Sequence, residues 1–205
     1  ENQSSAPAFV AALPTLGPRI LKAPAARRRI ATRRRAYSTI AEHADPSQLA
    51  GQLNTHRAAM NQAILGQAGT VMQFVGDAVM AVFGAPVAFG DDPERAVRAS
   101  IAVRSAVDDL NAADPELDLQ VRIAVNTGEA VAALGARPEL GESMVAGDVV
   151  NTASRLQALA PVNGVLVGDE THRSTKRAID YRPVDPVTLK GKSAPVRAWV
   201  ALAPA

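Results

Sequence analysis

Residues 69–84 read GTVMQFVGDAVMAVFG. Two apolar runs, residues 70–75 and 78–83, flank the pair Gly76-Asp77, and a glycine–acid pair between two such runs is typical of a tight β-hairpin. The pattern therefore predicts two antiparallel strands with Asp77 at the tip of their turn. A carboxylate held there suits a hard divalent cation that also touches phosphate oxygens. The same pair favours turns for backbone reasons alone, so this stretch by itself leaves Asp77 open as a plain turn residue.

The rest of the chain alternates between helix and strand signals. Asp45-Pro46 and Asp92-Pro93 are helix starts, each followed by apolar residues at helical spacing. The expected elements are a helix from 46, strands at 70–75 and 78–83, a helix from 92 to about 111, a strand at 119–125, a helix at 148–159, a strand at 165–167, a short helix capped by Asp169, and strands near 187–189 and 196–200. This order predicts an α+β fold with a ferredoxin-like sheet covered by helices.

Composition limits the class of protein. The 205 residues suffice for one domain of ordinary size plus an extension, and 47% of them are hydrophobic but only 3% aromatic. The core must therefore be built from Val, Leu, Ile and Ala. The absence of cysteine excludes a disulfide framework and thiolate metal sites. We see neither an apolar run long enough to span a bilayer nor the order of a signal peptide, so we expect a cytoplasmic setting.

The first 36 residues differ from the rest. They hold eight of the 22 basic side chains but only Glu1 of the 20 acidic ones, and they show no sustained apolar period. We interpret residues 1–36 as a basic, irregular extension or an altered opening strand, and residues 37–201 as the domain. A basic run is a candidate for nucleic acid or membranes, but this one lacks aromatic interleaving and helical amphipathicity. We therefore expect no nucleic acid and no membrane as partner of this chain.

Two further segments carry chemistry. Residues 147–156 read GDVVNTASRL, so Asn151 and Arg155, four residues apart, share one face of a helix. An amide beside a guanidinium can clamp ribose and phosphate oxygens, although a solvated helix face explains the pair equally well. Lys190 lies in the loop 188–192, TLKGK, which fits either a triphosphate grip or a plain basic surface.

Taken together, these segments resemble class III adenylyl and guanylyl cyclases of the bacterial, actinobacterial type in residue type, order and spacing. The matching parts are residues 69–84, residues 118–135, the Asn151/Arg155 helix and the Lys190 loop, and the resemblance covers residues 37–201. It implies the nucleotidyl cyclase fold and conversion of ATP, or GTP, to cyclic AMP, or cyclic GMP, and pyrophosphate. It also implies a homodimer with sites at its interface, and two Mg²⁺ or Mn²⁺ ions held by two aspartates of one subunit that assist attack of the ribose 3′-hydroxyl on the α-phosphate.

The resemblance assigns a role to each matching residue. Asp77 corresponds to the second metal aspartate, Asn151 and Arg155 to the pair that orients the ribose and stabilises phosphoryl charge across the interface, and Lys190 to the lysine that grips the polyphosphate. The two base-reading positions depart from the adenylyl pattern, a lysine with an aspartate or threonine, because they are occupied by Gln73 and Met144. Glutamine can read a purine edge, whereas methionine offers only packing. We therefore expect ATP as substrate with relaxed base selectivity.

The largest departure lies before Tyr37. The first metal aspartate of the family falls on Arg33, within an arginine-rich run at residues 27–35, so one ligand position is lost. Unpaired guanidiniums cannot line a buried strand. Three explanations stay open: a degenerate cyclase kept for binding or dimerisation, an altered N-terminus that displaces the opening strand, or a local slip with an aspartate elsewhere serving.

The rival function is a catalytically silent module for nucleotide binding or dimerisation. A third reading is a regulatory interaction domain that binds no nucleotide, against which the presence of both Asn151 and Arg155 argues.

Overall fold

The computed structural model describes residues 8–16, 46–75, 78–85, 87–114, 119–132, 145–189 and 194–205. Over residues 8–16, 46–54, 73–75, 78, 131–132 and 145–146 it describes the backbone alone.

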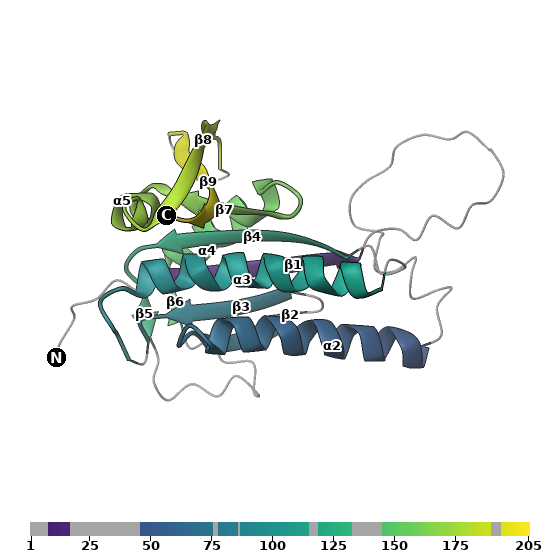
Figure 1. Ribbon diagram of the computed structural model, residues 1–205. Helices are drawn as coiled ribbons and strands as arrows, with labels where there is room; N and C mark the ends of the chain where they lie inside the picture. Colours follow the sequence, from purple (N-terminus) through teal and green to yellow (C-terminus); the bar gives the residue numbers. More distant parts are fainter. Residues whose placement is uncertain are drawn as a thin grey trace.

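A seven-stranded sheet forms the centre of the molecule, and its strands run in the order β2-β3-β1-β4-β7-β9-β8 (Figure 1). Most neighbours are antiparallel, and β4 and β7 form a parallel pair. The expected α+β fold is confirmed. The strands are β1 (Ala8–Leu16), β2 (Thr70–Val75), β3 (Ala78–Phe83), β4 (Leu119–Thr127), β7 (Gly164–Gly168), β8 (Ile179–Val187) and β9 (Val196–Pro204).

The bounds of the central strand β1 were not predicted. Residues 1–36 were interpreted as an irregular extension or an altered opening strand, and Ala8–Leu16, purple in Figure 1, lies between β3 and β4 and pairs antiparallel with both. The pairing is decided by partners more than 60 residues away in sequence, which a local pattern does not contain. Arg33 and its basic neighbours lie outside the described residues, and the domain division at residue 36 stays a prediction.

The predicted hairpin is confirmed residue for residue. β2 and β3 pair antiparallel, and the ladder closes with Val75 opposite Ala78. The two connecting residues, Gly76 and Asp77, lie outside the described residues.

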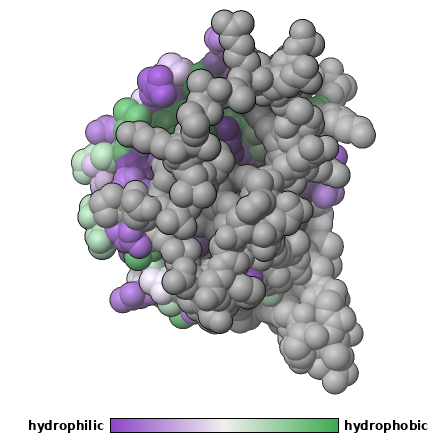
Figure 2. Space-filling model, turned by 90° about the vertical axis from the view of Figure 1, so that its right-hand side faces the viewer, coloured by the Kyte–Doolittle hydropathy of each residue, from purple (hydrophilic) through white to green (hydrophobic). Residues whose placement is uncertain are grey.

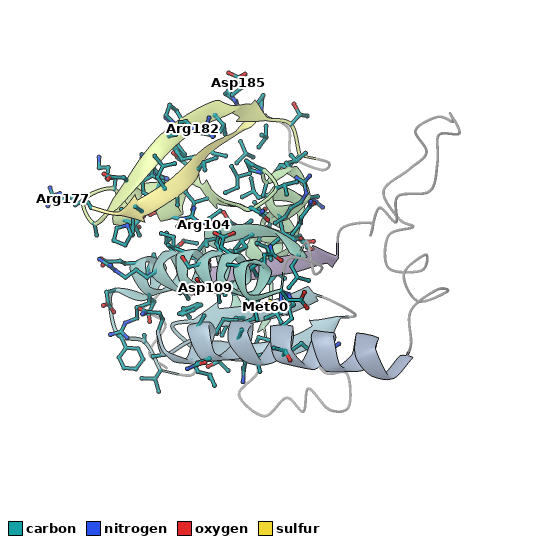
Figure 3. All side chains as sticks on the ribbon, turned by 45° about the vertical axis from the view of Figure 1, so that its right-hand side comes forward. Met60, Arg104, Asp109, Arg177, Arg182 and Asp185 are labelled. Carbon is teal, nitrogen blue, oxygen red and sulfur yellow. The ribbon has the colours of Figure 1, made fainter. Side chains whose placement is uncertain are left out.

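Helices α2 (Pro46–Leu65) and α3 (Asp92–Ala113) cover one face of the sheet, close to their predicted bounds. Side chains alternate along β4, so that Leu119, Val121, Ile123 and Val125 are buried on this side. They share a core with Met60 of α2, which lies between its helix and the strands in Figure 3, and with Val97, Val103 and Val107 of α3.

Helix α4 (Asp148–Leu159) has the predicted bounds, and it covers the opposite face. Leu156 packs with Ala124 of β4 and Leu166 of β7, while Val149 and Ala153 pack with Met72 and Val82 of the hairpin. The short strands β5 (Val131–Ala132) and β6 (Val145–Ala146) pair with each other just before α4.

The C-terminal part departs from the prediction in its strand bounds. The strand expected near 187–189 is β8, which begins at Ile179 and ends at Val187. Pro183 and Pro186 argue against a strand in the sequence. However, β8 is an edge strand, where proline is tolerated. Arg182 and Asp185 project from it at the outer margin of the molecule (Figure 3).

Helix α5 (Asp169–Thr175) follows β7, and its cap is Gly168 rather than the expected Asp169, which stands in the first turn. Two histidines have defined surroundings. His172 of α5 stacks on Trp199 of β9 with ring centroids 4.0 Å apart, and His56 of α2 is only 3% exposed.

Candidate functional site

The candidate site is built on helix α4, which begins at the end of the sheet where β4 terminates. Gly147, just before the helix, has φ of 151°, and a Cβ added there would lie 3.3 Å from the carbonyl oxygen of Glu129. Because glycine has no Cβ, residue 147 can adopt this φ and its backbone can approach the backbone of Glu129. The helix then runs back along the sheet to β7, which makes β4–α4–β7 a parallel crossover unit.

Asn126 fixes the first turn of α4. Its Nδ2 donates to the carbonyl oxygen of Val149 at 3.2 Å. On its other side, a Cβ added to Gly168 would lie 2.4 Å from Asn126 Oδ1, so a side chain at position 168 would displace the Asn126 amide. The sequence analysis did not single out Asn126. The signal that could have found it is an amide placed directly after the apolar run of β4.

The far end of α4 is held by two side chains. Gln157 Nε2 donates to the carbonyl oxygen of Arg122 at 3.1 Å, and the Arg122 guanidinium donates to the carbonyl oxygen of Ala160. These contacts come in addition to the buried apolar side of the helix, so α4 is fixed at both ends.

The predicted pair lies on the outer side of this anchored helix. Asn151 is exposed and Arg155 is half-buried, while Thr152, Ala153 and Leu156 are buried. Among the described residues, neither Asn151 nor Arg155 has a side-chain hydrogen bond or ion pair. An amide and a guanidinium one turn apart are therefore both available to a ligand or a partner domain.

The first turn of α4 and the β2–β3 turn lie at opposite ends of the sheet. Phe83, the last residue of β3, is level with Thr127, the last residue of β4, because both pair with Ala8. The side chain of Val149 packs against Gly128, which places the start of α4 at this end. The β2–β3 turn precedes Ala78, at the other end of β3.

The structure brings together only two of the predicted site residues. Gln73 is described as backbone in β2, where it pairs with Met80 just after a register irregularity that begins at Val71. Asp77, Met144 and Lys190 lie outside the described residues.

The described residues do not supply a full set of oxygen ligands for divalent cations. Over their full described lengths, the adjacent strands β2, β3, β1 and β4 contain no acidic residue. Within the described ranges, no three His, Cys, Asp or Glu side chains gather into a group that could hold a metal ion. The charged side chain of β4 level with Leu13 of β1 is Arg122, a cation. Because hard divalent cations require oxygen ligands, usually carboxylates, these residues do not fit a two-ion centre.

Comparison with known proteins gives the context of this site. The family model of the adenylate and guanylate cyclase catalytic domain matches residues 35–201. The chain belongs to the class III nucleotidyl cyclase catalytic-domain family. The cyclase domain is 31% identical over 163 residues to adenylate cyclase 1 of Rhizobium meliloti, an alignment that covers 77% of this chain and 24% of the relative. It therefore spans about a quarter of the length of that protein.

Solved structures agree with the fold. The cyclase domain matches the adenylyl cyclase CyaB from P. aeruginosa with a TM-score of 0.77 and 25% identity, over 96% of this chain and 93% of that chain. It matches the guanylate cyclase domain of RhGC from Catenaria anguillulae, in complex with GTP, with a TM-score of 0.75 and 18% identity, over 98% and 97% of the two chains.

Figure 2 shows the described residues mainly along the left side of the view. Hydrophilic and hydrophobic side chains are mixed there, as on an ordinary exposed surface. None of the helices in the described part of the chain is both long and apolar enough to cross a membrane.

Proposed function

We propose that this domain catalyses the cyclisation of ATP, and less selectively of GTP, to the 3′,5′-cyclic monophosphate and pyrophosphate. The observation that carries the proposal is the anchored helix α4, which presents Asn151 and Arg155 outward without partners in the described part of the chain. Membership of the cyclase family supplies the reaction class.

The reaction needs orientation and charge stabilisation. The ribose 3′-oxygen bonds to the α-phosphorus, the bond from that phosphorus to the bridging oxygen breaks, pyrophosphate leaves, and the hydroxyl proton passes to water. Asn151 orients the ribose through its amide. Arg155 donates to the phosphoryl oxygens, where negative charge develops in the transition state. Lys190 binds the leaving polyphosphate as a point charge.

The site lies between two cyclase domains. Asn151 and Arg155 face away from the sheet that carries their own helix, and the first turn of α4 is remote from the β2–β3 turn of the same chain. Their substrate therefore rests against a second domain of this fold, in a homodimer or a pair with a related chain. Nucleoside triphosphates are abundant in the cytoplasm, where we place the domain.

Base selection falls to Gln73 and Met144. Glutamine presents both a donor and an acceptor and can adapt to either purine by rotating its amide. Methionine adds packing without polar discrimination. We therefore expect a modest preference for ATP over GTP.

The family generally uses Mg²⁺ or Mn²⁺, which would neutralise the triphosphate and activate the attacking hydroxyl. The described residues of the four strands β1, β2, β3 and β4 contain no carboxylate that would hold such an ion. The lack of acidic ligands in these strands favours a second candidate function, a silent module that binds nucleotide or dimerises without turnover.

An aspartate scan distinguishes the two functions. Aspartate is placed singly at each of residues 13–16, the last four of β1, and each purified variant is incubated with Mn²⁺ and ATP or GTP. The wild-type chain should form cyclic nucleotide, detected by mass spectrometry, with ATP the better substrate, and at least one aspartate variant should be more active. If the wild-type chain keeps its fold by circular dichroism but forms no product, the cyclase proposal is wrong for this chain and the silent module stands.

A further inference from the structure

We infer that a β-bulge at Met72 in β2 takes part in selecting the purine base, because it places Gln73 on the face of the sheet that α4 covers, and that Met72 is the residue that positions Gln73. The inference rests on the proposed function and deepens it, since it names the element that holds the base-reading residue. Met72 is not among the site residues that the sequence predicted.

The ladder between β2 and β3 contains one extra residue on the β2 side. Val71 pairs with Ala81, and the next pair joins Gln73 to Met80, so the ladder passes over Met72. Two residues of β2 thus oppose one residue of β3, which is the arrangement of a β-bulge. Bulges of this kind often redirect a side chain beside an active site.

The strand is fixed on both sides of the bulge. Upstream, Thr70 Oγ1 donates to the carbonyl oxygen of Ala85 at 3.1 Å. Downstream, Val75 pairs with Ala78 where the hairpin closes. Because both ends of β2 are held in register, the strand cannot slide along β3 to absorb the extra residue, and the bulge stays at Met72.

The bulge decides on which face of the sheet Gln73 lies. Successive residues of a regular strand alternate between the two faces, and directly paired residues share a face. Met72 is only 4% exposed and packs with Val149 and Ala153 of α4, so it lies on the face that α4 covers. Met80, the partner of Gln73, packs against the same cluster, which places Gln73 on this face as well.

A regular strand would place residue 73 on the opposite face. That face belongs to the core under α2 and α3, which contains Val79, the partner of Phe74, and against which Val71 packs. An amide side chain in this apolar core would be unfavourable without hydrogen-bond partners. The bulge therefore keeps Gln73 out of the core and gives the core position to Phe74.

Met72 also joins the base-reading position to the helix that carries Asn151. Its two α4 partners, Val149 and Ala153, lie two residues before and two residues after Asn151. One packing cluster therefore sets the spacing between the residue that meets the purine and the residue that orients the ribose. Site residues supported by packed strands and helices are held more precisely than residues on loops, which selection between two purines requires.

Thiol labelling tests the placement, because the chain contains no cysteine. Gln73→Cys and Phe74→Cys, each shown to be folded by circular dichroism, are treated with a maleimide in the presence of Mn²⁺. The reaction is run without ligand, with α,β-methylene-ATP, which cannot release pyrophosphate, or with tripolyphosphate, which has no base. Gln73→Cys should react in the folded chain, whereas Phe74→Cys should react only after unfolding in urea. At a concentration about ten times its Kd, the ATP analogue should slow the labelling of Gln73→Cys about 10-fold, since only the unliganded fraction reacts, and tripolyphosphate should not.

Paired alanine variants test whether Met72 positions Gln73. Met72→Ala and Val82→Ala each remove a buried side chain from the same cluster, but only the first lies at the bulge. The ratio of ATP to GTP affinity is measured by calorimetry. Met72→Ala and Gln73→Ala should each bring this ratio to about one, and the double variant should change it no further, because the two residues act as a unit. Val82→Ala is the matched control and should keep the wild-type ratio.

Every outcome decides a point. Labelling of Phe74→Cys rather than Gln73→Cys in the folded chain overturns the placement by the bulge. Unchanged labelling of Gln73→Cys under an ATP analogue that binds by calorimetry overturns the contact with the base. An equal change of the affinity ratio in Val82→Ala overturns the positioning role of Met72. A chain that binds nucleotide with the expected labelling and ratios but forms no cyclic product defeats the proposed function and leaves this inference standing, and a chain that binds no nucleotide overturns both.

Discussion

Acidification should destabilise this domain through His56. The imidazole lies on the buried side of α2, only 3% exposed, and neither ring nitrogen has a hydrogen-bond partner. Burial, followed by the nearby charge of Arg57, lowers the pKa of His56 from 6.5 to about 4. The folded state thus holds a neutral imidazole at a pH at which the unfolded chain has already bound a proton.

The sign and size of the change in the free energy of unfolding follow from the linkage between folding and proton binding. Between pH 6.5 and 4 the unfolded state binds more protons, so the free energy of unfolding falls as the pH falls. At 1.36 kcal/mol per pKa unit, the full shift corresponds to a loss of about 3 kcal/mol, of which about 2 kcal/mol is lost by pH 5. This is a large fraction of the stability of an ordinary domain.

The assay is urea unfolding at pH 7.5 and pH 5 for the wild-type chain and for His56→Leu. The variant replaces the imidazole with an apolar side chain of similar size that cannot bind a proton. Other groups titrate alike in both proteins, including His172, whose pKa is also lowered by burial. The wild type should therefore lose about 2 kcal/mol more than the variant on acidification. Equal losses in the two proteins would refute the reasoning.

Three further perturbations have defined outcomes. Gly168→Ala places a methyl group 2.4 Å from Asn126 Oδ1 and should displace the amide that holds α4, lowering cyclic nucleotide formation by an active dimer as well as the melting temperature; unchanged turnover would count against the positioning role of Asn126. Gly69→Ala brings a methyl group within 2.5 Å of the Phe83 ring and should cost about 1–3 kcal/mol in urea unfolding, so a neutral result would contradict the packing described. Arg33→Asp alone should not raise turnover strongly, because β1 already occupies the centre of the sheet; strongly raised activity of that single variant would show that the opening strand lies elsewhere.

Local patterns predicted much of the fold. The hairpin strands, α2, α3 and α4 follow from apolar periodicity, Asp-Pro helix starts and a glycine–acid turn, all of which act within a few residues. Local patterns could not predict the pairing of strands that are distant in the sequence. β1 contains three alanines and Pro14, a composition that does not favour a strand, and it forms between β3 and β4. β8 was likewise hidden by two prolines that only an edge position tolerates.

The relative placement of two candidate site residues was predicted. The helical spacing of Asn151 and Arg155 placed both on one side of α4, where Asn151 is exposed and Arg155 is half-buried, because helix geometry alone fixes that relation. The supports of α4 were missed, since Asn126, Gly168 and Gln157 act through contacts between elements distant in sequence. The roles of Asp77, Gln73, Met144 and Lys190 stay predictions, because nothing in the described structure tests them.

The central claim is that Arg155 of α4 stabilises the phosphoryl charge that develops during cyclisation. The most direct test compares the turnover of an active dimer with that of the same dimer carrying Arg155→Ala. Ser154→Ala, also at an exposed position of α4, is the matched control. Loss of a preorganised donor to a developing phosphoryl charge should lower turnover about 100- to 1,000-fold for Arg155→Ala, with an unchanged melting temperature, and Ser154→Ala should have little effect. Equal turnover in the two variants would contradict the account.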